Sequence, residues 1–210
     1  MKKALVIGGT GLIGKQLIEQ LLADSRYNVI ALARKPLAIQ HEKLLQPPFD
    51  FDHPDNSLIV ADEIFCCLGT TIKKAGSKQG FYKVDYQYVL TVARAGYSNG
   101  AKKFALVSSL GANKNSGIFY SKTKGEIEEA VTGIGYESLF IFRPSMLLGQ
   151  RAEFRVGEMI GKLLMKSFAF LIPKKYKAIA GGQVAKAMID CMNSGKTGVN
   201  ILASDSIAAF

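Results

Sequence analysis

The stretch that decides the fold is ALVIGGTGLIGKQLIEQLL at residues 4–22. Its first four residues, Ala4–Ile7, form a short apolar run that ends at Gly8, which is typical of a buried parallel strand. Beyond the glycines, apolar residues recur at helical spacing from Leu12 to Leu22. The stretch therefore predicts a strand, a glycine-rich turn and an amphipathic helix, in that order.

The glycines between this strand and this helix fit the spacing of a dinucleotide-binding turn. Gly8, Gly11 and Gly14 match G-x-x-G-x-x-G, and Gly9 gives the narrower G-x-G-x-x-G with the last two. Such glycines permit a tight turn, let the backbone approach a pyrophosphate and allow close packing of the helix. The phosphates would meet the free N–H groups and the positive dipole end of the helix that begins near Leu12. We expect a nicotinamide dinucleotide site here, with a purely structural turn as the alternative.

The rest of the chain alternates strands with helices. Strands are predicted at Asn28–Ala33, near Phe49–Phe51, at Ile64–Leu68, Phe104–Val107, Ser138–Phe142 and Val199–Leu202. Helices are predicted at about Tyr82–Tyr97, Tyr120–Val131 and Gln183–Met192. This alternation favours one Rossmann-like α/β domain over residues 1–210, a doubly wound parallel sheet in a three-layer α/β/α arrangement.

Composition argues against several other classes of protein. The formal net charge is +10, but the 27 basic residues are scattered and form no recognisable nucleic-acid-binding module. A solvated basic surface is therefore favoured over nucleic-acid binding. No run of eighteen apolar residues occurs, so no membrane span is expected. The three cysteines and two histidines lack the spacing of a disulfide framework or metal site, and the start of the chain does not fit a signal peptide. We expect a cytoplasmic protein without a metal.

The end of the second predicted strand indicates which dinucleotide is preferred. An NAD site usually carries an acid about 20 residues beyond the glycines, whereas this chain has Arg34 and Lys35 there. A guanidinium can bind a 2′-phosphate through two hydrogen bonds. The sequence therefore favours NADP(H) over NAD(H). The alternative is a pair of basic residues on an exposed loop.

Candidate catalytic residues follow the strand at Phe104–Val107. Tyr120 and Lys124 form a Y-x-x-x-K pattern, which is weak by itself, since about 0.8 such pairs are expected by chance. The pair opens a predicted helix, however, so both side chains would share one face. Upstream, Ser108 and Ser109 end a strand, and open α/β sheets bind ligands at the carboxyl ends of their strands. An ordinary start of an amphipathic helix remains the alternative for Tyr120 and Lys124.

At this point the chain resembles the short-chain dehydrogenase/reductase superfamily. More narrowly, it is similar to the atypical group typified by the Tat-interacting-protein oxidoreductases and the NmrA-like proteins. The matching segments are GGTGLIG (8–14), the Arg34-Lys35 pair, CCLGTT (66–71) followed by KVDYQYVL (83–90), LVSSLGA (106–112), YSKTKGEIE (120–128) and FRPSMLLG (142–149).

The resemblance implies a role for each matching residue. Tyr120 would be the general acid or base, Lys124 would hold the nicotinamide ribose and favour the tyrosinate, and Ser109 or its neighbour Ser108 would hydrogen-bond the substrate oxygen. The remaining positions would contact the cofactor. They are Thr10, Gly11, Leu12 and Ile13 at the pyrophosphate, Leu68 and Gly69 beside the cofactor, and Arg143 and Pro144 at its nicotinamide end.

These observations predict an NADP-dependent oxidoreductase that transfers hydride to or from a small carbonyl or alcohol. Two alternatives remain: a regulator that senses NADP without turnover, and an epimerase or dehydratase that uses bound NAD(P). Residues 150–180 are expected to form the substrate-side wall. A homodimer is plausible through the helix that carries Tyr82, Tyr86, Val89, Leu90 and Ala93.

Overall fold

The centre of the molecule is a parallel sheet of seven strands. A computed structural model describes residues 1–148, 173 and 176–210 of the chain. The strand order is β3-β2-β1-β4-β5-β6-β9, and each neighbouring pair is parallel. The strands are β1 (Lys2–Ile7), β2 (Tyr27–Leu32), β3 (Leu44–Leu45), β4 (Glu63–Cys66), β5 (Lys103–Val107), β6 (Ser138–Arg143) and β9 (Gly198–Ala203). This order confirms the predicted Rossmann-like fold.

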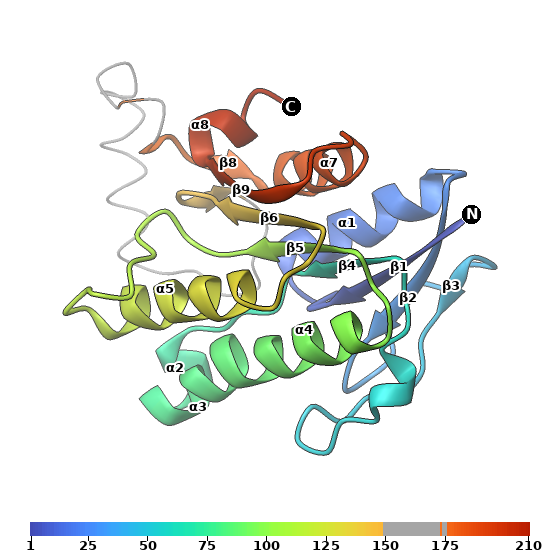
Figure 1. Cartoon of the computed structure of the whole chain (residues 1–210), viewed down its shortest axis with the longest axis horizontal. Helices are drawn as coiled ribbons and strands as arrows, with labels where there is room; N and C mark the ends of the chain where they lie inside the picture. Colours follow the sequence, from blue (N-terminus) through green and yellow to red (C-terminus); the bar gives the residue numbers. More distant parts are fainter. Residues whose placement is uncertain (149–172, 174–175) are drawn as a thin grey trace.

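Helices cover both faces of the sheet, so the molecule has three layers. In Figure 1, α1 and α7 lie above the sheet, and α4 and α5 lie below it. The main helices are α1 (Leu12–Ala23), α4 (Val89–Ser98), α5 (Phe119–Thr132) and α7 (Gly181–Met192). The shorter ones are η1 (Asn56–Leu58), α2 (Ile72–Ala75), α3 (Lys78–Tyr82), the π-helical segment η2 (Lys83–Tyr88) and α8 (Ser204–Ile207).

Each face of the sheet contributes to a separate apolar core. Val6 and Phe65 pack toward α1 and α7, whereas Ile7 and Ile64 pack toward α4 and α5. All four residues of β4 are buried. A strand with helices on both sides must be apolar on both faces, which explains why these strands appear in the sequence as continuous apolar runs.

The structure corrects the predicted third strand. The strand beside β2 is β3 at Leu44–Leu45, and not the segment near Phe49–Phe51. Pro48 makes only an isolated bridge with Ala33, because a proline has no N–H to donate to a ladder. Phe49 and Phe51 are buried nonetheless, with ring centroids 4.8 Å apart at 79°. Their apolar character therefore reflects core packing and not strand pairing.

The helix predicted from Tyr82 begins earlier. Helical structure runs from Lys78 through α3, η2 and α4 to Ser98. Ser77 caps its beginning, where its hydroxyl accepts a hydrogen bond from the Gly80 N–H at 2.9 Å. The wider π-helical turn interrupts the regular apolar spacing, so periodicity alone does not locate the first turn, residues 78–81.

The expected substrate wall at residues 150–180 falls mainly outside the described residues, which omit 149–172 and 174–175. Within its described part, β8 (Ile179–Ala180) pairs with β7 (Leu147–Leu148) as a small separate sheet. Just beyond it, α7 packs beside α1 in Figure 1.

Candidate cofactor and active site

Two glycines of the first turn are required by backbone packing. Gly8 has a φ of +80°, and a Cβ there would lie 2.4 Å from the carbonyl carbon of Cys67. A Cβ on Gly14 would lie 2.2 Å from the carbonyl oxygen of Gly8. Neither position can hold a side chain without moving backbone. The lack of a side chain at these two positions therefore lets the end of β1 pack closely against the backbone after β4 and against the first turn of α1.

Gly11 has a different environment. It is exposed, it precedes α1 as the N-cap residue, and a Cβ there would meet only the Gly8 carbonyl oxygen, at 3.2 Å. Among the described residues no side chain caps α1, so the first N–H groups of the helix, at Leu12 and Ile13, are available to an anion. Thr10 is also exposed beside them. An uncapped helix N-terminus next to an open glycine fits the pyrophosphate of a dinucleotide.

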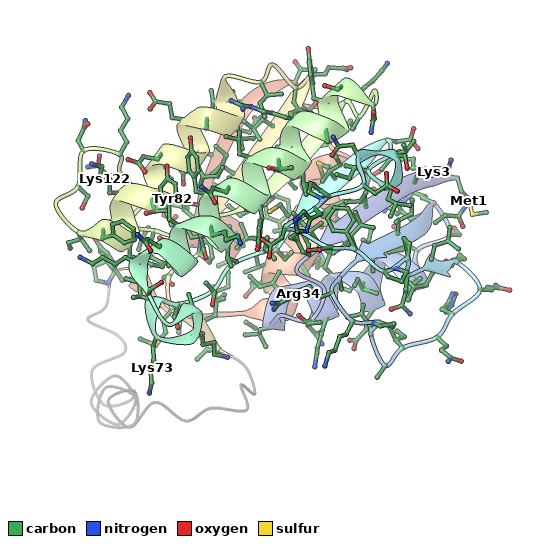
Figure 2. The ribbon with its side chains drawn as sticks, turned by 90° about the horizontal axis from the view of Figure 1, so that it is seen from below. Met1, Lys3, Arg34, Lys73, Tyr82 and Lys122 are labelled. Carbon is green, nitrogen blue, oxygen red and sulfur yellow. The ribbon has the colours of Figure 1, made fainter. Side chains whose placement is uncertain are left out.

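The loop after β2 approaches this turn. A Cβ on Gly9 would lie 2.7 Å from Cδ1 of Ile18 and 3.3 Å from Cδ1 of Leu37, so this loop packs against the glycine turn. Arg34, labelled in Figure 2, and Lys35 are exposed at the start of the loop. Neither side chain has an ion-pair partner within the described part of the chain. Their charges are free to meet a phosphate.

The structure brings Lys124 into a buried ion pair. Lys124 is 5% exposed on α5, and its Nζ lies 2.8 Å from Oδ1 of the fully buried Asp85. Burial acts to lower the pKa of Lys124, but the charges of Asp85 and Tyr120 outweigh it, and the pKa lies above its ordinary value. Lys124 is therefore a fixed cation. Tyr120, one turn earlier on α5, is half-buried.

Asp85 is the site residue that sequence reasoning missed. Its Oδ2 accepts a hydrogen bond from the Thr70 N–H at 2.8 Å, so one carboxylate joins the loop after β4 to Lys124. A Cβ on Gly69 would lie 3.4 Å from Oδ1 of Asp85 and 3.7 Å from Nζ of Lys124. Gly69 is exposed and Leu68 is half-buried beside Gly8. The available signal was a single acid within KVDYQYVL, an otherwise uncharged stretch after its first lysine.

The two serines after β5 have buried hydroxyls without a hydrogen-bond partner among the described residues. The Ser108 N–H donates to Phe142 O at 2.7 Å, and the Ser109 carbonyl accepts from Ala112 N–H at 3.0 Å. The same loop meets α5 where the Asn113 N–H donates to the Ser121 carbonyl at 3.0 Å. Buried polar groups are nearly always paired, so either hydroxyl is a candidate for a ligand oxygen.

Arg143, which is half-buried, makes a second ion pair with α5. Its guanidinium donates from Nε and Nη2 to both carboxylate oxygens of Glu128, which is 5% exposed. Pro144 accepts a backbone hydrogen bond from the Leu110 N–H at 3.1 Å. These contacts fix the end of β6 to α5 and to the serine loop. The expected contact of Arg143 and Pro144 with the nicotinamide end of the cofactor stays a prediction.

The described residues hold neither a metal centre nor a membrane-spanning helix. No cluster of three or more histidine, cysteine, aspartate or glutamate side chains suited to a metal occurs in this part of the chain. Within the same residues, no helix has the length and apolar character needed to cross a membrane.

Comparison with known proteins places this geometry in a family. The family described as NAD(P)H-binding matches residues 8–131. Protein HTATIP2 of Rattus norvegicus is 34% identical over 204 residues, covering 94% of this chain and 84% of that protein. The mitochondrial protein fmp52 of Aspergillus niger is 32% identical, covering 96% of this chain and 89% of that protein.

Solved structures show the same fold at lower identity. MoeE5 in complex with UDP-glucose and NAD has a TM-score of 0.74 at 15% identity, covering 99% of this chain and 80% of that chain. The UDP-N-acetylglucosamine 4-epimerase from Methanobrevibacter ruminantium M1 has a TM-score of 0.72 at 18% identity, covering 96% and 76%. The matched glycine turn, the parallel sheet and these relatives agree: the chain belongs to the NAD(P)H-binding family, among the atypical short-chain dehydrogenase/reductase proteins related to HTATIP2 and fmp52.

Proposed function

We propose that this protein is an NADP-dependent oxidoreductase that interconverts a small carbonyl compound and its alcohol. The observation that carries the proposal is the pairing of Tyr120 with a buried, charged Lys124 on α5, at the edge of the sheet where Gly69 leaves space beside Lys124. A buried ammonium group is costly unless it is paired. A protein that only bound the cofactor could use Lys124 for the ribose but would have no need of a general acid at Tyr120.

Each residue has a distinct task in the proposed reaction. Bound NADP(H) would supply or accept the hydride. The Tyr120 hydroxyl would give a proton to the carbonyl oxygen or take one from the alcohol, and general acid–base catalysis of this kind contributes about 10²–10⁴-fold. Lys124 would hold the nicotinamide ribose. The hydroxyl of Ser109, or of Ser108, would donate a hydrogen bond to the substrate oxygen.

The preference for NADP(H) over NAD(H) is supported by the charges after β2. Arg34 and Lys35 are exposed beside the glycine turn, and no acid stands among residues 33–41 of this loop. An acid at this place would repel a 2′-phosphate and accept ribose hydroxyls instead. Free guanidinium and ammonium groups attract the phosphate.

Two alternatives make different demands on the same site. A regulator would bind NADP(H) tightly without turnover. An epimerase or dehydratase would keep the cofactor through a full cycle. The MoeE5 structure named above contains UDP-glucose and NAD, and the 4-epimerase structure contains UDP-N-acetylmuramic acid. At 15–18% identity, the similarity of these structures shows the fold alone, and the substrate of this chain must come from experiment.

The test begins with cofactor binding and continues with a substrate screen. Thermal-shift titration with NADP, NADPH, NAD and NADH measures which cofactor stabilises the protein. A library of small aldehydes, ketones and alcohols is then assayed by NADPH absorbance with the unmodified protein, Tyr120→Phe and Tyr97→Phe. Tyr97 lies on α4 and is 45% exposed, so its variant is the matched control.

The possible results separate the three functions. Turnover of a carbonyl or alcohol that fails in Tyr120→Phe and persists in Tyr97→Phe supports the oxidoreductase. Tight NADP binding without any turned-over compound favours the regulator. Cofactor that stays bound while a UDP-sugar is converted favours the epimerase.

Two further expectations stay predictions. The fungal relatives carry a mitochondrial location in their names, whereas the sequence favours the cytoplasm, and cell fractionation would distinguish the two.

For the homodimer, Val89 and Ala93 are buried against the core, whereas Tyr82, Tyr86 and Leu90 keep exposed surface for a twin subunit. Sedimentation measures this association.

A further inference from the structure

Two helical segments face each other with matching spacing. Phe81 and Asp85 are four residues apart at the junction of α3 and η2, and both are fully buried. Tyr120 and Lys124 are four residues apart on α5. The ring of Phe81 lies 5.4 Å from the ring of Tyr120, centroid to centroid, while Oδ1 of Asp85 lies 2.8 Å from Nζ of Lys124. Each member of one pair thus contacts one member of the other.

We propose that Phe81 and Asp85 are positioning residues, which fix the side chains of Tyr120 and Lys124 across the interface between the α3–η2 segment and α5. The roles of Tyr120 and Lys124 in chemistry rest on the proposed function, but the positioning itself can be measured without a substrate. Phe81 restricts the orientation of the Tyr120 phenol ring, and Asp85 fixes the position of the Lys124 ammonium group.

Asp85 restrains a side chain that would otherwise be mobile. A lysine side chain has several rotatable bonds and loses much conformational entropy when it is fixed, so its Nζ needs a strong partner. The Asp85 carboxylate is itself fixed, because the Thr70 N–H donates to its other oxygen. The π-helical turn that contains Asp85 widens the backbone at this point, as such turns frequently do at functional sites.

The titratable groups around Lys124 come from three elements. Asp85 faces it from η2, Tyr120 from the preceding turn of α5, and Cys66 from β4. Burial raises the pKa of Cys66 to about 12, so this thiol is neutral at physiological pH. Asp85 is therefore the carboxylate on which the charge of Lys124 depends.

Phe81 restrains the phenol ring from the same side. It packs between Tyr120 and Phe119, with 6.0 Å and 60° between the Phe81 and Phe119 rings. Its sequence neighbour Tyr82 is half-buried and stacks on Tyr86 at 4.6 Å, so the two aromatic contacts are separate. Figure 2 labels Tyr82 on this outer helical segment. Loss of the Phe81 ring would leave Tyr120 room to change its orientation.

The first test measures the pKa of Lys124 in the ligand-free protein. Lysine labelled with ¹³C is titrated by NMR, and the Lys124 signal is identified by its loss in Lys124→Arg. In Asp85→Asn we expect this pKa to fall by about one pH unit or more, as removal of an adjacent opposite charge does. Glu128→Gln is the matched control, since Glu128 is a buried carboxylate on α5 that pairs with Arg143. An unchanged Lys124 pKa in Asp85→Asn overturns the role of Asp85.

If Asp85→Asn does not fold, the pKa of Lys124 cannot be measured in it, and the stability of a double variant tests the ion pair instead. The neutral double variant Asp85→Asn with Lys124→Met removes both charges, and we expect it to fold and to be more stable than Asp85→Asn alone. Replacement of both members of a buried ion pair is commonly better tolerated than removal of one. A double variant no more stable than the single one would contradict the pairing.

The second test follows the Tyr120 ring by NMR, with its signals assigned through Tyr120→Phe. In Phe81→Leu we expect at least a twofold change in line width or a resolved second ring orientation. Phe104→Leu is the control, because Phe104 is equally buried but packs on Tyr136, at 5.2 Å. Unchanged Tyr120 signals in folded Phe81→Leu overturn the role of Phe81. Either result stands whether or not a substrate for the proposed oxidoreductase is found.

Discussion

The edge of the sheet where the strands begin, the amino edge, differs from the edge where they end, the carboxyl edge, in how its polar groups are hydrogen-bonded. At the amino edge, Glu63 is 2% exposed and accepts from Lys2 Nζ at 2.8 Å and from the Tyr27 hydroxyl at 2.9 Å. Asn193, at the end of α7, donates to the same Tyr27 hydroxyl at 2.6 Å and accepts from Lys2 at 2.9 Å. Lys103 lies 3.7 Å from Glu63. Each polar group in this cluster has a protein partner.

At the carboxyl edge, several groups lack such partners. The hydroxyls of Ser108, Ser109 and Thr123 are buried without a hydrogen-bond partner among the described residues, and α1 begins without a side-chain cap. Unsatisfied buried polar groups reduce stability, so their concentration at one edge indicates a ligand site. The amino edge therefore contributes to the stability of the fold, whereas we expect the carboxyl edge to bind a ligand.

The largest effect is expected from a substitution within the glycine turn, which tests whether the carboxyl edge binds the cofactor. We expect Gly11→Val to abolish cofactor binding while the protein stays folded, because the added side chain takes the place of the pyrophosphate without a severe backbone contact. Gly14→Val is the matched variant and should not fold normally, since its Cβ would lie 2.2 Å from the Gly8 carbonyl oxygen. Calorimetric titration with NADPH and circular dichroism measure the two effects. Unchanged affinity in folded Gly11→Val would show that this glycine serves the turn alone.

The next largest effect concerns the chemistry at the carboxyl edge. Tyr120→Phe should lower turnover by about 10²–10⁴-fold, because it removes the proton donor, and should change cofactor affinity little. Lys124→Ala should weaken both, since Lys124 is assigned to the ribose. Steady-state kinetics on a substrate from the screen, with NADPH affinity measured in parallel, separate the two. Full activity in Tyr120→Phe would refute the assignment.

The amino edge should respond in stability and not in function. Glu63→Gln keeps the shape of the side chain but removes the charge that Lys2 and the Tyr27 hydroxyl contact. We expect a loss of about 1.5–3 kcal/mol in the free energy of unfolding, the usual value for hydrogen bonds to a charged group. Urea denaturation measures this loss. NADPH affinity should be unchanged, and a large drop in affinity would show that the two edges are coupled.

The smallest expected effect concerns the preference of the protein for NADP(H) over NAD(H). NADP(H) should bind at least tenfold more tightly than NAD(H), and Arg34→Ala should remove most of that preference. A charge-assisted contact contributes about 1.5–3 kcal/mol, which is sufficient for this ratio. Lys43→Ala is the control, because Lys43 donates to the Asp24 carbonyl at the amino edge. Equal affinities for both cofactors in the unmodified protein would remove the basis for the NADP preference.

The fold class could be predicted from the amino-acid sequence, and the candidate site residues could be proposed from it. A buried strand, a glycine turn and an amphipathic helix require the same local geometry wherever they occur, so residues 4–22 predicted β1 and α1 within two residues. The Y-x-x-x-K spacing likewise placed Tyr120 and Lys124 on one helix, because helical periodicity depends only on nearby residues.

Only the tertiary structure showed which distant residues meet. Asp85 lies 39 positions before Lys124, and Phe81 the same distance before Tyr120, so no local pattern could pair them. The short strand β3 depends on register with β2, and Phe49 appeared strand-like because its ring fills the core. Gly8, Gly11 and Gly14 look equivalent in the sequence. The space around each one distinguishes a glycine that packs against backbone from one that is open to a ligand, and that space is created by β4 and α1 after the chain has folded.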